Sequence, residues 1–277
     1  EKYLTDAFSE KAVEFINESS QPFMMYLAYN AVHTPMQATD EDMAKFEGHP
    51  RQKLAAMTYA LDRGVGTVIR GLKDSGKFDN TLIFFLSDNG GATTNQSSNY
   101  PLKGFKGNKF EGGHRVPYFV VWKNGIPAGK PYDGLVSSLD IFATAIDAAS
   151  ISKTRNRLDG VSLLPYLKGK KGEPHKVLYW RKMDTRAIRS GDYKLIITHG
   201  VDSVLYNIRR DPEEMNNLIN KEPDLYRKLA KKLAKWEKNE CIEPSWLEEG
   251  WRKITNRYHQ QLMHNEIKTA QDLYKRK

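Results

Sequence analysis

The sequence predicts an α/β fold, in which helices cover a mixed, largely parallel sheet and a small α+β domain with a four-stranded antiparallel sheet follows. Two patterns carry this prediction. Short hydrophobic segments alternate with amphipathic helical patterns over about the first 165 residues. Four short strand patterns with tight polar turns then follow from about residue 175, ahead of one more helical pattern. We therefore place a domain boundary near residue 170, with residues 1–170 before it and 171–277 after it.

The first domain is expected to start with a helix over 3–18, because Leu4, Phe8, Ala12 and Phe15 recur at helical spacing. Further helices are predicted over 51–74 and 137–149, and strands over 22–29, 81–87 and 116–122. Strands that alternate with helices in this way are typical of a parallel sheet with helices on its faces. A long polar loop from 88 to about 115 separates the last two strands.

The second domain is expected to be an antiparallel meander, because only tight turns separate its strands. These strands are predicted over 176–180, 185–190, 193–199 and 203–208. The segment 222–239 reads as a helix with Pro223 near its first turn. Its buried face should hold Leu225, Leu229, Leu233 and Trp236, and its wet face Lys228, Lys231, Lys232 and Lys235. The tail from Cys241 onward shows no clear pattern.

Composition narrows the classes of protein. The 277 residues are 39% hydrophobic, enough for one large core or for one core and a small second domain. No apolar run approaches ~18 residues, so no membrane span is predicted. The single Cys241 excludes an intramolecular disulfide and a cysteine-based metal site. The chain lacks an initiator Met and opens within a helical pattern, so we expect a piece of a longer protein, whose compartment is not legible from targeting signals.

The net charge of +9 suits an anionic partner, and the alternative is a solvated basic helix face, which the charge alone favours. About +5 of this charge lies in the last 57 residues, which hold 14 Lys or Arg and 9 Asp or Glu. Nothing in the sequence indicates a nucleic-acid partner.

Asp88 and Asn89 directly follow the predicted strand 81–87. Ligands of open α/β sheets collect beyond the carboxyl ends of the strands. Carboxylate and amide oxygens there suit calcium or magnesium better than zinc. Gly90 and Gly91 let backbone approach a ligand closely. The alternative is a simple Asn-Gly turn.

Two other loops also follow predicted strands. His33 comes just beyond the strand 22–29, where an imidazole can hold an anion or protonate a leaving group. The segment "LKGFKGNKFEGGHRVP" interleaves glycines with Lys103, Lys106, Lys109 and Arg115, and this pattern can cradle a tetrahedral anion. It lacks the GxxxxGK[ST] pattern of a P-loop. A structural His33 and a flexible basic loop are the alternatives.

Eight stretches in order resemble the C-terminal part of a formylglycine-dependent sulfatase of the arylsulfatase type, in the alkaline phosphatase superfamily. They are "YLTDAFSEKAVEFI", "PFMMYLAYNAVHTPMQA", "YALDRGVGTVIRGLKDSGKFDNTLIFFLSDNGG", "PLKGFKGNKFEGGHRVP", "SSLDIFATAIDAA", "LDGVSLLPYL", "AIRSGDYKLI" and "LYNIRRDPEEMNNL". Each is weak alone, and their order with plausible spacing is a specific signal. The resemblance fades after about residue 240.

The resemblance implies a role for each motif residue. Asp88 and Asn89 match the strand-end pair that binds calcium, and Asp88 is also placed to deprotonate the formylglycine hydrate. His33, in His-x-Pro, matches a histidine that contacts the sulfate and the leaving oxygen. Lys106, in Lys-Gly-x-x-Phe-Glu-Gly-Gly, matches a sulfate-binding lysine. We expect all four side chains to face one cavity. Framework positions are matched by Glu111, Arg115 and Pro117.

Other parts of the family's active site are absent from the sequence. The C/S-x-P-x-R motif that becomes formylglycine does not occur, and "CIEPSW" at 241–246 has the wrong spacing and no Arg. The family's N-terminal aspartate pair, which completes the calcium site, is also missing. The resemblance therefore implies that the N-terminal half of the sulfatase supplies the nucleophile, and that this chain alone is inactive.

Three functions are compatible with these observations. The leading one is hydrolysis of sulfate esters, with sulfated carbohydrate as the expected substrate class. The alternative is a non-catalytic sulfatase-like remnant that binds anions or polysaccharide. A phosphatase or phosphodiesterase of the same superfamily is disfavoured, because its two-zinc members need an imidazole where Asn89 stands. Family habit favours a periplasmic, secreted or lysosome-like location.

Overall fold

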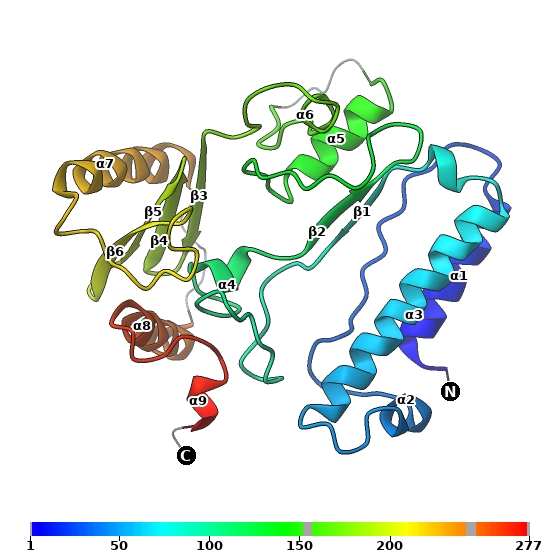
Figure 1. Ribbon diagram of the computed structural model, residues 1–277, viewed down its shortest axis with the longest axis horizontal. Coiled ribbons are helices and arrows are strands. Elements are labelled where there is room, and N and C mark those ends of the chain that lie inside the picture. Colours follow the sequence, from blue (N-terminus) through cyan, green and yellow to red (C-terminus); the bar gives the residue numbers. More distant parts are fainter. Residues whose placement is uncertain (1, 152–156, 242–247, 276–277) are drawn as a thin grey trace. The chain divides into compact units, whose positions relative to one another are not determined.

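The computed structural model describes residues 2–151, 157–241 and 248–275 (Figure 1). Its helices are α1 (Leu4–Glu18), α2 (Asp40–Ala44), α3 (Gln52–Asp74), η1 (Phe78–Asn80), α4 (Glu111–His114), α5 (Asp140–Ala148), α6 (Leu164–Leu167), α7 (Pro223–Glu240), α8 (Glu249–Met263) and α9 (Asp272–Lys275). Its strands are β1 (Ile83–Leu86), β2 (Tyr118–Val121), β3 (Val177–Lys182), β4 (Thr185–Ser190), β5 (Tyr193–Thr198) and β6 (Asp202–Asn207). No helix among these residues is long and apolar enough to cross a membrane.

The chain folds as two compact units. The first consists of Glu1–Ile83, Thr94–Gln96 and Val120–Ala128, and the second of Phe84–Thr93, Ser97–Phe119 and Gly129–Lys277. The Lys106 loop belongs to the same unit as the antiparallel sheet β3–β6. The boundary near residue 170 separates two kinds of secondary-structure pattern and stays a prediction of the sequence.

In the first unit, α1 packs against α3 through small residues. A Cβ atom on Gly64 would lie 2.6 Å from the Ser9 hydroxyl oxygen, and one on Gly71 would lie 2.8 Å from a Val13 methyl carbon. Both glycines therefore allow a close helix approach that side chains would block. The helix itself was predicted correctly, but its predicted inner face was wrong.

The buried positions of α1 are Thr5, Ser9, Ala12 and Ile16. Leu4 and Phe15, which the pattern placed inside, are 49% and 45% exposed. The close approach to the α3 glycines explains this rotation, because it leaves room only for small side chains in the seam.

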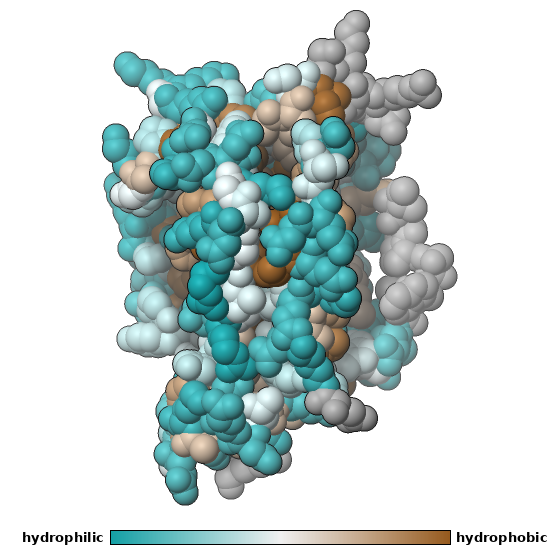
Figure 2. Space-filling model, turned by 90° about the vertical axis from the view of Figure 1, so that its right-hand side faces the viewer, coloured by the Kyte–Doolittle hydropathy of each residue, from teal (hydrophilic) through white to brown (hydrophobic). Residues whose placement is uncertain are grey.

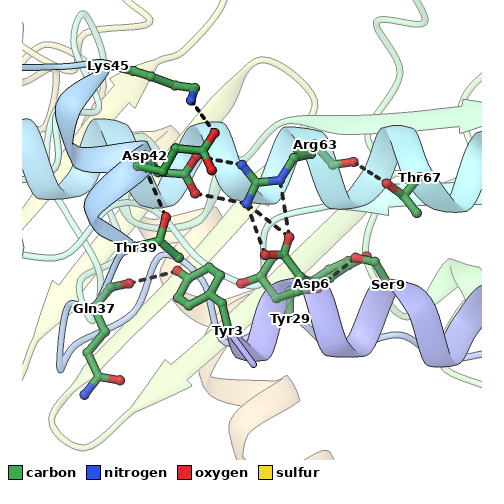
Figure 3. Close-up of polar contacts among 12 residues, drawn as sticks. Tyr3, Asp6, Ser9, Tyr29, Gln37, Thr39, Asp42, Lys45, Arg63 and Thr67 are labelled. Atoms are coloured by element: carbon green, nitrogen blue, oxygen red, sulfur yellow. Dashed lines mark hydrogen bonds and ion pairs between the residues drawn. The ribbon is translucent and has the colours of Figure 1, made fainter. Parts of the chain in front are cut away.

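Arg63 of α3 joins this helix to α1 and α2 (Figure 3). Its guanidinium donates to both carboxylate oxygens of buried Asp42 at 2.6 and 2.9 Å, and to Asp6 of α1 at 3.1 Å. These charge-assisted bonds hold the pKa of the Asp42 carboxyl below its usual value. The network fixes α1 and α2 against α3.

Two of the three strands predicted for the first domain are confirmed. β1 and β2 pair in a two-stranded sheet, a little shorter than the predicted 81–87 and 116–122. The prediction of a strand over 22–29 was wrong. A strand needs a ladder partner, and the described residues provide none there. Burial still alternates along 23–29, with Met24 and Tyr26 on the exposed side.

Residues 24–27 and one side of α1 line an apolar groove in the first unit. Phe8, Ala12, Phe15 and Met25 contribute to its walls. Figure 2 shows hydrophobic surface exposed between hydrophilic residues on one face of the molecule. Isolated exposed apolar residues are common on protein surfaces.

The four-stranded antiparallel sheet of the second unit is confirmed. Its order is β3-β4-β5-β6, and each strand pairs with the next through a tight turn (Figure 1). In the register, Ile188 of β4 faces Leu195 of β5, which in turn faces Leu205 of β6. These three buried residues lie on one face of the sheet and pack against α7.

The predicted faces of α7 are confirmed. Leu229 and Leu233 are fully buried against the sheet, and Leu225 and Trp236 pack at the edges of the same cluster. The exposed side carries the predicted lysines, Lys228, Lys231, Lys232 and Lys235.

The opposite face of the sheet packs against the tail and against the Lys106 loop. Buried Ile196 and Tyr206 of the sheet form one cluster with Phe105 and Phe110 of the loop. Residues of α8 and the segment after it complete this cluster: Leu262, Met263, Ile267 and Ala270. The Lys106 loop thus packs on this face of the sheet. The tail, for which the sequence showed no pattern, packs against the same cluster.

Candidate functional site

Asp88 and Asn89 lie just beyond the end of β1, as the sequence predicts. Asp88 is exposed and Asn89 is partly exposed. The Ser87 hydroxyl donates to the Asn89 main-chain carbonyl at 2.8 Å, which tightens the turn. Within the described residues no group hydrogen-bonds to the carboxylate of Asp88 or to the side-chain amide of Asn89. Both side chains therefore keep their oxygens available for a ligand.

Backbone hydrogen bonds join this strand end to the Lys106 loop. The Lys106 N–H donates to the Gly91 carbonyl at 3.0 Å, and the Gly90 N–H donates to the Gly113 carbonyl at 3.1 Å. A Cβ atom on Gly90 would lie only 1.8 Å from the Gly112 carbonyl oxygen. Glycine is thus required for the two loops to meet, and the simple turn considered above does not account for this close approach.

Asn99 braces the same junction with its side chain. Its Oδ1 accepts from the Gly91 N–H at 2.7 Å, and its Nδ2 donates to the carbonyls of Gly91 at 3.2 Å and Gly104 at 3.1 Å. The Gly104 N–H in turn donates to the Lys268 carbonyl at 2.7 Å. One amide therefore holds the Asp88 turn, the start of the Lys106 loop and, through Gly104, the tail in register.

A buried charge cluster anchors the other end of the loop. Lys194 of β5 is fully buried, and its ammonium lies 2.9 Å from a carboxylate oxygen of Glu111 and 2.9 Å from one of Glu214. The second Glu214 oxygen accepts from the Glu111 main-chain N–H at 2.6 Å. The antiparallel sheet thereby fixes the Glu-Gly-Gly segment that follows Lys106.

The cluster shifts the pKa values of its two carboxyl groups in opposite directions. Burial opposes ionisation of Glu111, yet Lys194 and His114 outweigh it and hold the pKa of the Glu111 carboxyl well below its usual range. Burial, helped by the negative Glu111, raises the pKa of the Glu214 carboxyl well above its ordinary value. Burial and the Lys194 charge lower the pKa of His114 to about 4, so its ring is neutral and stacks on Trp180 at 4.5 Å.

Lys103 is a structural lysine, contrary to its expected place among the anion-cradling lysines. Its side chain is fully buried, and its ammonium donates to the Glu214 carbonyl at 3.1 Å and to the Asn265 side chain at 2.6 Å. Burial lowers its pKa to about 8. Lys106, Lys109 and Arg115 keep at least part of their surface accessible. Of the four basic residues expected to cradle an anion, Lys103 therefore does not fit that role.

His33 belongs to the first unit and stands in a loop tied on both sides. Asn95 donates to the Val32 carbonyl at 3.1 Å, and Tyr3 donates to the Gln37 carbonyl at 2.8 Å. The exposed His33 ring has its Nδ1 2.6 Å from the Thr34 carbonyl. A carbonyl only accepts, so Nδ1 carries the proton in this contact. That His33 shares a cavity with Asp88 and Lys106 stays a prediction.

The donor set suits calcium only in part. Asp88 and Asn89 offer hard oxygens, but calcium takes 6–8 oxygen ligands. Within the described ranges no group of three or more His, Cys, Asp and Glu residues could hold a metal ion. A calcium ion at this strand end would therefore need oxygen ligands beyond the side chains of Asp88 and Asn89.

Several residues of this site carried no signal in the sequence. Lys194, Glu214 and Asn99 act through partners far away in the chain or through backbone atoms, and no motif marked them. A lysine within an otherwise hydrophobic strand, as in "YKLIITH", is the one local signal that could have found Lys194.

Comparison with known proteins identifies the family to which this α/β fold belongs. The sulfatase family model matches residues 1–151, and that of the C-terminal region of N-sulphoglucosamine sulphohydrolase matches residues 106–239. The chain therefore belongs to the sulfatase family, and its fold class is that of the alkaline phosphatase-like sulfatases, as predicted.

Two curated relatives illustrate the similarity. The uncharacterized sulfatase YdeN of Escherichia coli (strain K12) is 40% identical over 64% of this chain and 33% of its own length. N-acetylgalactosamine-6-sulfatase of Canis lupus familiaris is 32% identical over 70% of this chain and 38% of its own length. The chain thus spans little more than a third of these relatives.

A solved structure extends the similarity to the tail. Ps i-CgsB, crystallised with k-i-k-neocarrahexaose, is 36% identical and superimposes with a TM-score of 0.82 over 93% of this chain and 59% of its own.

Proposed function

We propose that this chain is the sulfate-binding portion of a sulfatase that hydrolyses sulfate esters of a carbohydrate. The observation that carries the proposal is the backbone junction between the two loops, Lys106 N–H to Gly91 and Gly90 N–H to Gly113. It joins the turn that carries an exposed carboxylate and an amide to the glycine-rich loop that carries Lys106. Hard-cation ligands beside an ammonium suit the oxygens of a sulfate group.

In this proposal each residue has a defined role. Lys106 binds a non-bridging sulfate oxygen and offsets its charge. His33 binds through Nε2, and as the imidazolium it gives a proton to the leaving oxygen. Asp88 and Asn89 would hold a calcium ion, and Asp88 would also accept a proton from the nucleophile. Calcium and formylglycine, when present, supply positive charge at the sulfate and the nucleophile respectively.

A carbohydrate substrate is supported by similarity. The relatives include an N-acetylgalactosamine-6-sulfatase, and Ps i-CgsB was crystallised with an oligosaccharide. The basic character of the chain fits a polyanionic glycan.

The test is hydrolysis of an aryl sulfate and of sulfated oligosaccharides with added calcium. The 277-residue chain alone should be inactive, because no C/S-x-P-x-R motif occurs in it. Activity should appear when a polypeptide carrying the formylglycine half of a sulfatase is added, and Lys106→Ala should abolish it. Cys241→Ala should have no effect, because the "CIEPSW" spacing is wrong.

The same experiment also tests one alternative function. The missing motif also fits a non-catalytic module that binds anions or polysaccharide. Sulfate binding without hydrolysis, even with the complementing polypeptide, would favour that alternative. Hydrolysis by the chain alone would reveal a nucleophile outside both proposals.

A further inference from the structure

Lys182 lies against the Lys106 loop. It is the last residue of β3, at the tip of the β3–β4 hairpin. A Cβ atom built on Gly107 would lie 3.2 Å from the Lys182 ammonium nitrogen. Gly107 directly follows Lys106 and has a φ of +96°. The antiparallel sheet thus brings a second ammonium group to the anion-binding loop, from 76 residues further along the chain.

No carboxylate of the described residues pairs with Lys182. The acidic residue closest in sequence, Asp184, is committed elsewhere, because it accepts from Arg252 at 2.8 Å and from Asn256 at 2.7 Å. The Lys182 side chain is exposed. It therefore does not serve as half of an ion pair in the described structure.

The positive charge at this place exceeds what one sulfate ester needs. Lys109 is half-buried and also lacks a carboxylate partner among the described residues. Burial and the charges of Lys182 and Lys194 lower its pKa to about 8. Partial burial and the charge of Lys106 lower the pKa of Lys182 as well. Like charges gathered in this way repel each other, and a bound anion relieves the repulsion.

A buried histidine near these lysines keeps one ring nitrogen without a hydrogen-bond partner among the described residues. His259 of α8 is fully buried, and its Nδ1 donates to the Thr255 carbonyl at 2.8 Å. Its Nε2 has no hydrogen-bond partner within the described structure. Burial, with the nearby charges of Lys109 and Lys182, lowers its pKa to about 4. Because Nδ1 carries the proton, this Nε2 is an acceptor, so His259 does not itself bind an anion.

We propose that Lys182 forms a second anion subsite beside Lys106, which binds a second sulfate or carboxylate on the same glycan. The proposal rests on the proposed function, since Lys106 must hold the first sulfate. A sulfate ester carries one negative charge, which a single lysine can balance. A substrate with two anionic groups uses both ammonium groups, so the inferred substrate class is a multiply sulfated or sulfated uronic-acid oligosaccharide.

The experiment measures binding of two disaccharides by isothermal titration, one carrying a single sulfate and the other an additional sulfate on the neighbouring sugar. The wild-type chain should bind the disulfated ligand about tenfold more tightly. Lys182→Ala should remove this preference and leave the monosulfated ligand within twofold. Lys182→Glu should weaken disulfated binding further. Lys235→Ala is the matched control, because this exposed lysine lies on α7, across the sheet from the loop, and should change nothing.

The outcomes separate the two proposals. Equal wild-type affinity for both ligands, with loss of both in Lys106→Ala, overturns the second subsite and leaves the sulfate site intact. An equal loss of both ligands in Lys182→Ala also overturns it, because both lysines then hold one sulfate. Binding of neither ligand by the wild type, or binding indifferent to Lys106→Ala, contradicts the proposed function itself. Thermal unfolding of each variant confirms that Lys182, being exposed, is dispensable for folding.

Discussion

Replacing Lys194 with methionine should strongly destabilise the second unit. The substitution keeps the volume of the side chain but removes the ammonium that lies 2.9 Å from both Glu111 and Glu214. Lys194 and Glu214 are fully buried, so Glu214 would lose its Lys194 countercharge in a site that water does not reach. Glu111 would keep its longer contacts with Arg115 and Arg189, at 3.7 and 3.9 Å. Breaking a buried ion pair from one side costs about 3–5 kcal/mol. We expect a loss of that size in the free energy of unfolding.

Urea unfolding followed by far-UV circular dichroism measures this loss. Lys228→Met, on the exposed side of α7, is the matched control and should cost less than about 0.5 kcal/mol. The double variant Lys194→Met/Glu214→Gln should be less destabilised than the two single changes together, because one stranded charge is gone and the glutamine oxygen still accepts from the Glu111 N–H. A cost below about 1 kcal/mol for Lys194→Met would refute the reasoning, since the cluster would then be hydrated or dispensable.

Three further predictions concern the core, the loop junction and the charge of the loop. Leu229→Ala should lower the free energy of unfolding by about 2–5 kcal/mol, against less than about 0.5 for Lys232→Ala, and equal costs in urea unfolding would show that the α7 face is not core. Gly90→Ala forces a Cβ atom to within 1.8 Å of the Gly112 carbonyl oxygen, so sulfate affinity should fall while circular dichroism stays native; unchanged affinity would contradict the junction. The pKa of Lys109 is lowered to about 8, so its ammonium loses its proton between pH 7 and 9, and sulfate binding should weaken as pH rises through this window. Lys109→Met should flatten that profile, whereas an unchanged slope in this variant would assign the dependence to another group.

Local patterns sufficed for the elements whose burial is set by their own sequence. α3, α7 and the four strands β3–β6 follow hydrophobic periodicity and turn residues, and their bounds agree with the predicted ranges to within two residues. The four-stranded meander needs only short connections, so its topology follows from chain order.

Packing against residues far away in the chain explains the features that the sequence did not predict correctly. The inner face of α1 was mispredicted because Gly64 and Gly71 on α3 admit only small partners, and nothing within α1 reveals this. The strand expected over 22–29 requires a neighbour that the described residues do not contain. α8 becomes a helix with a buried face only because Phe105 and the sheet provide a surface for Leu262 and Met263.

The residues of the candidate site also fall into those that the sequence indicates and those that only the fold reveals. The motif residues Asp88, Asn89 and Lys106 were found by their place after a strand or among glycines. Lys182 and Lys194 belong to the sheet that follows, and their proximity to the loop depends on the fold. Sequence patterns therefore mark the groups proposed to touch sulfate, whereas the residues that hold the loop or add charge to it emerge only from tertiary structure.

Titration of the ¹⁵N-labelled chain with inorganic sulfate, followed by amide chemical shifts, tests the central claim most directly. The account predicts saturable shifts at Lys106, Gly107 and the joined Asp88–Gly91 turn, and their loss in Lys106→Ala. The Lys235→Ala control should respond like the wild type. Saturable shifts confined to other lysines, or shifts at the loop that survive Lys106→Ala, would contradict the assignment of this loop as the sulfate site.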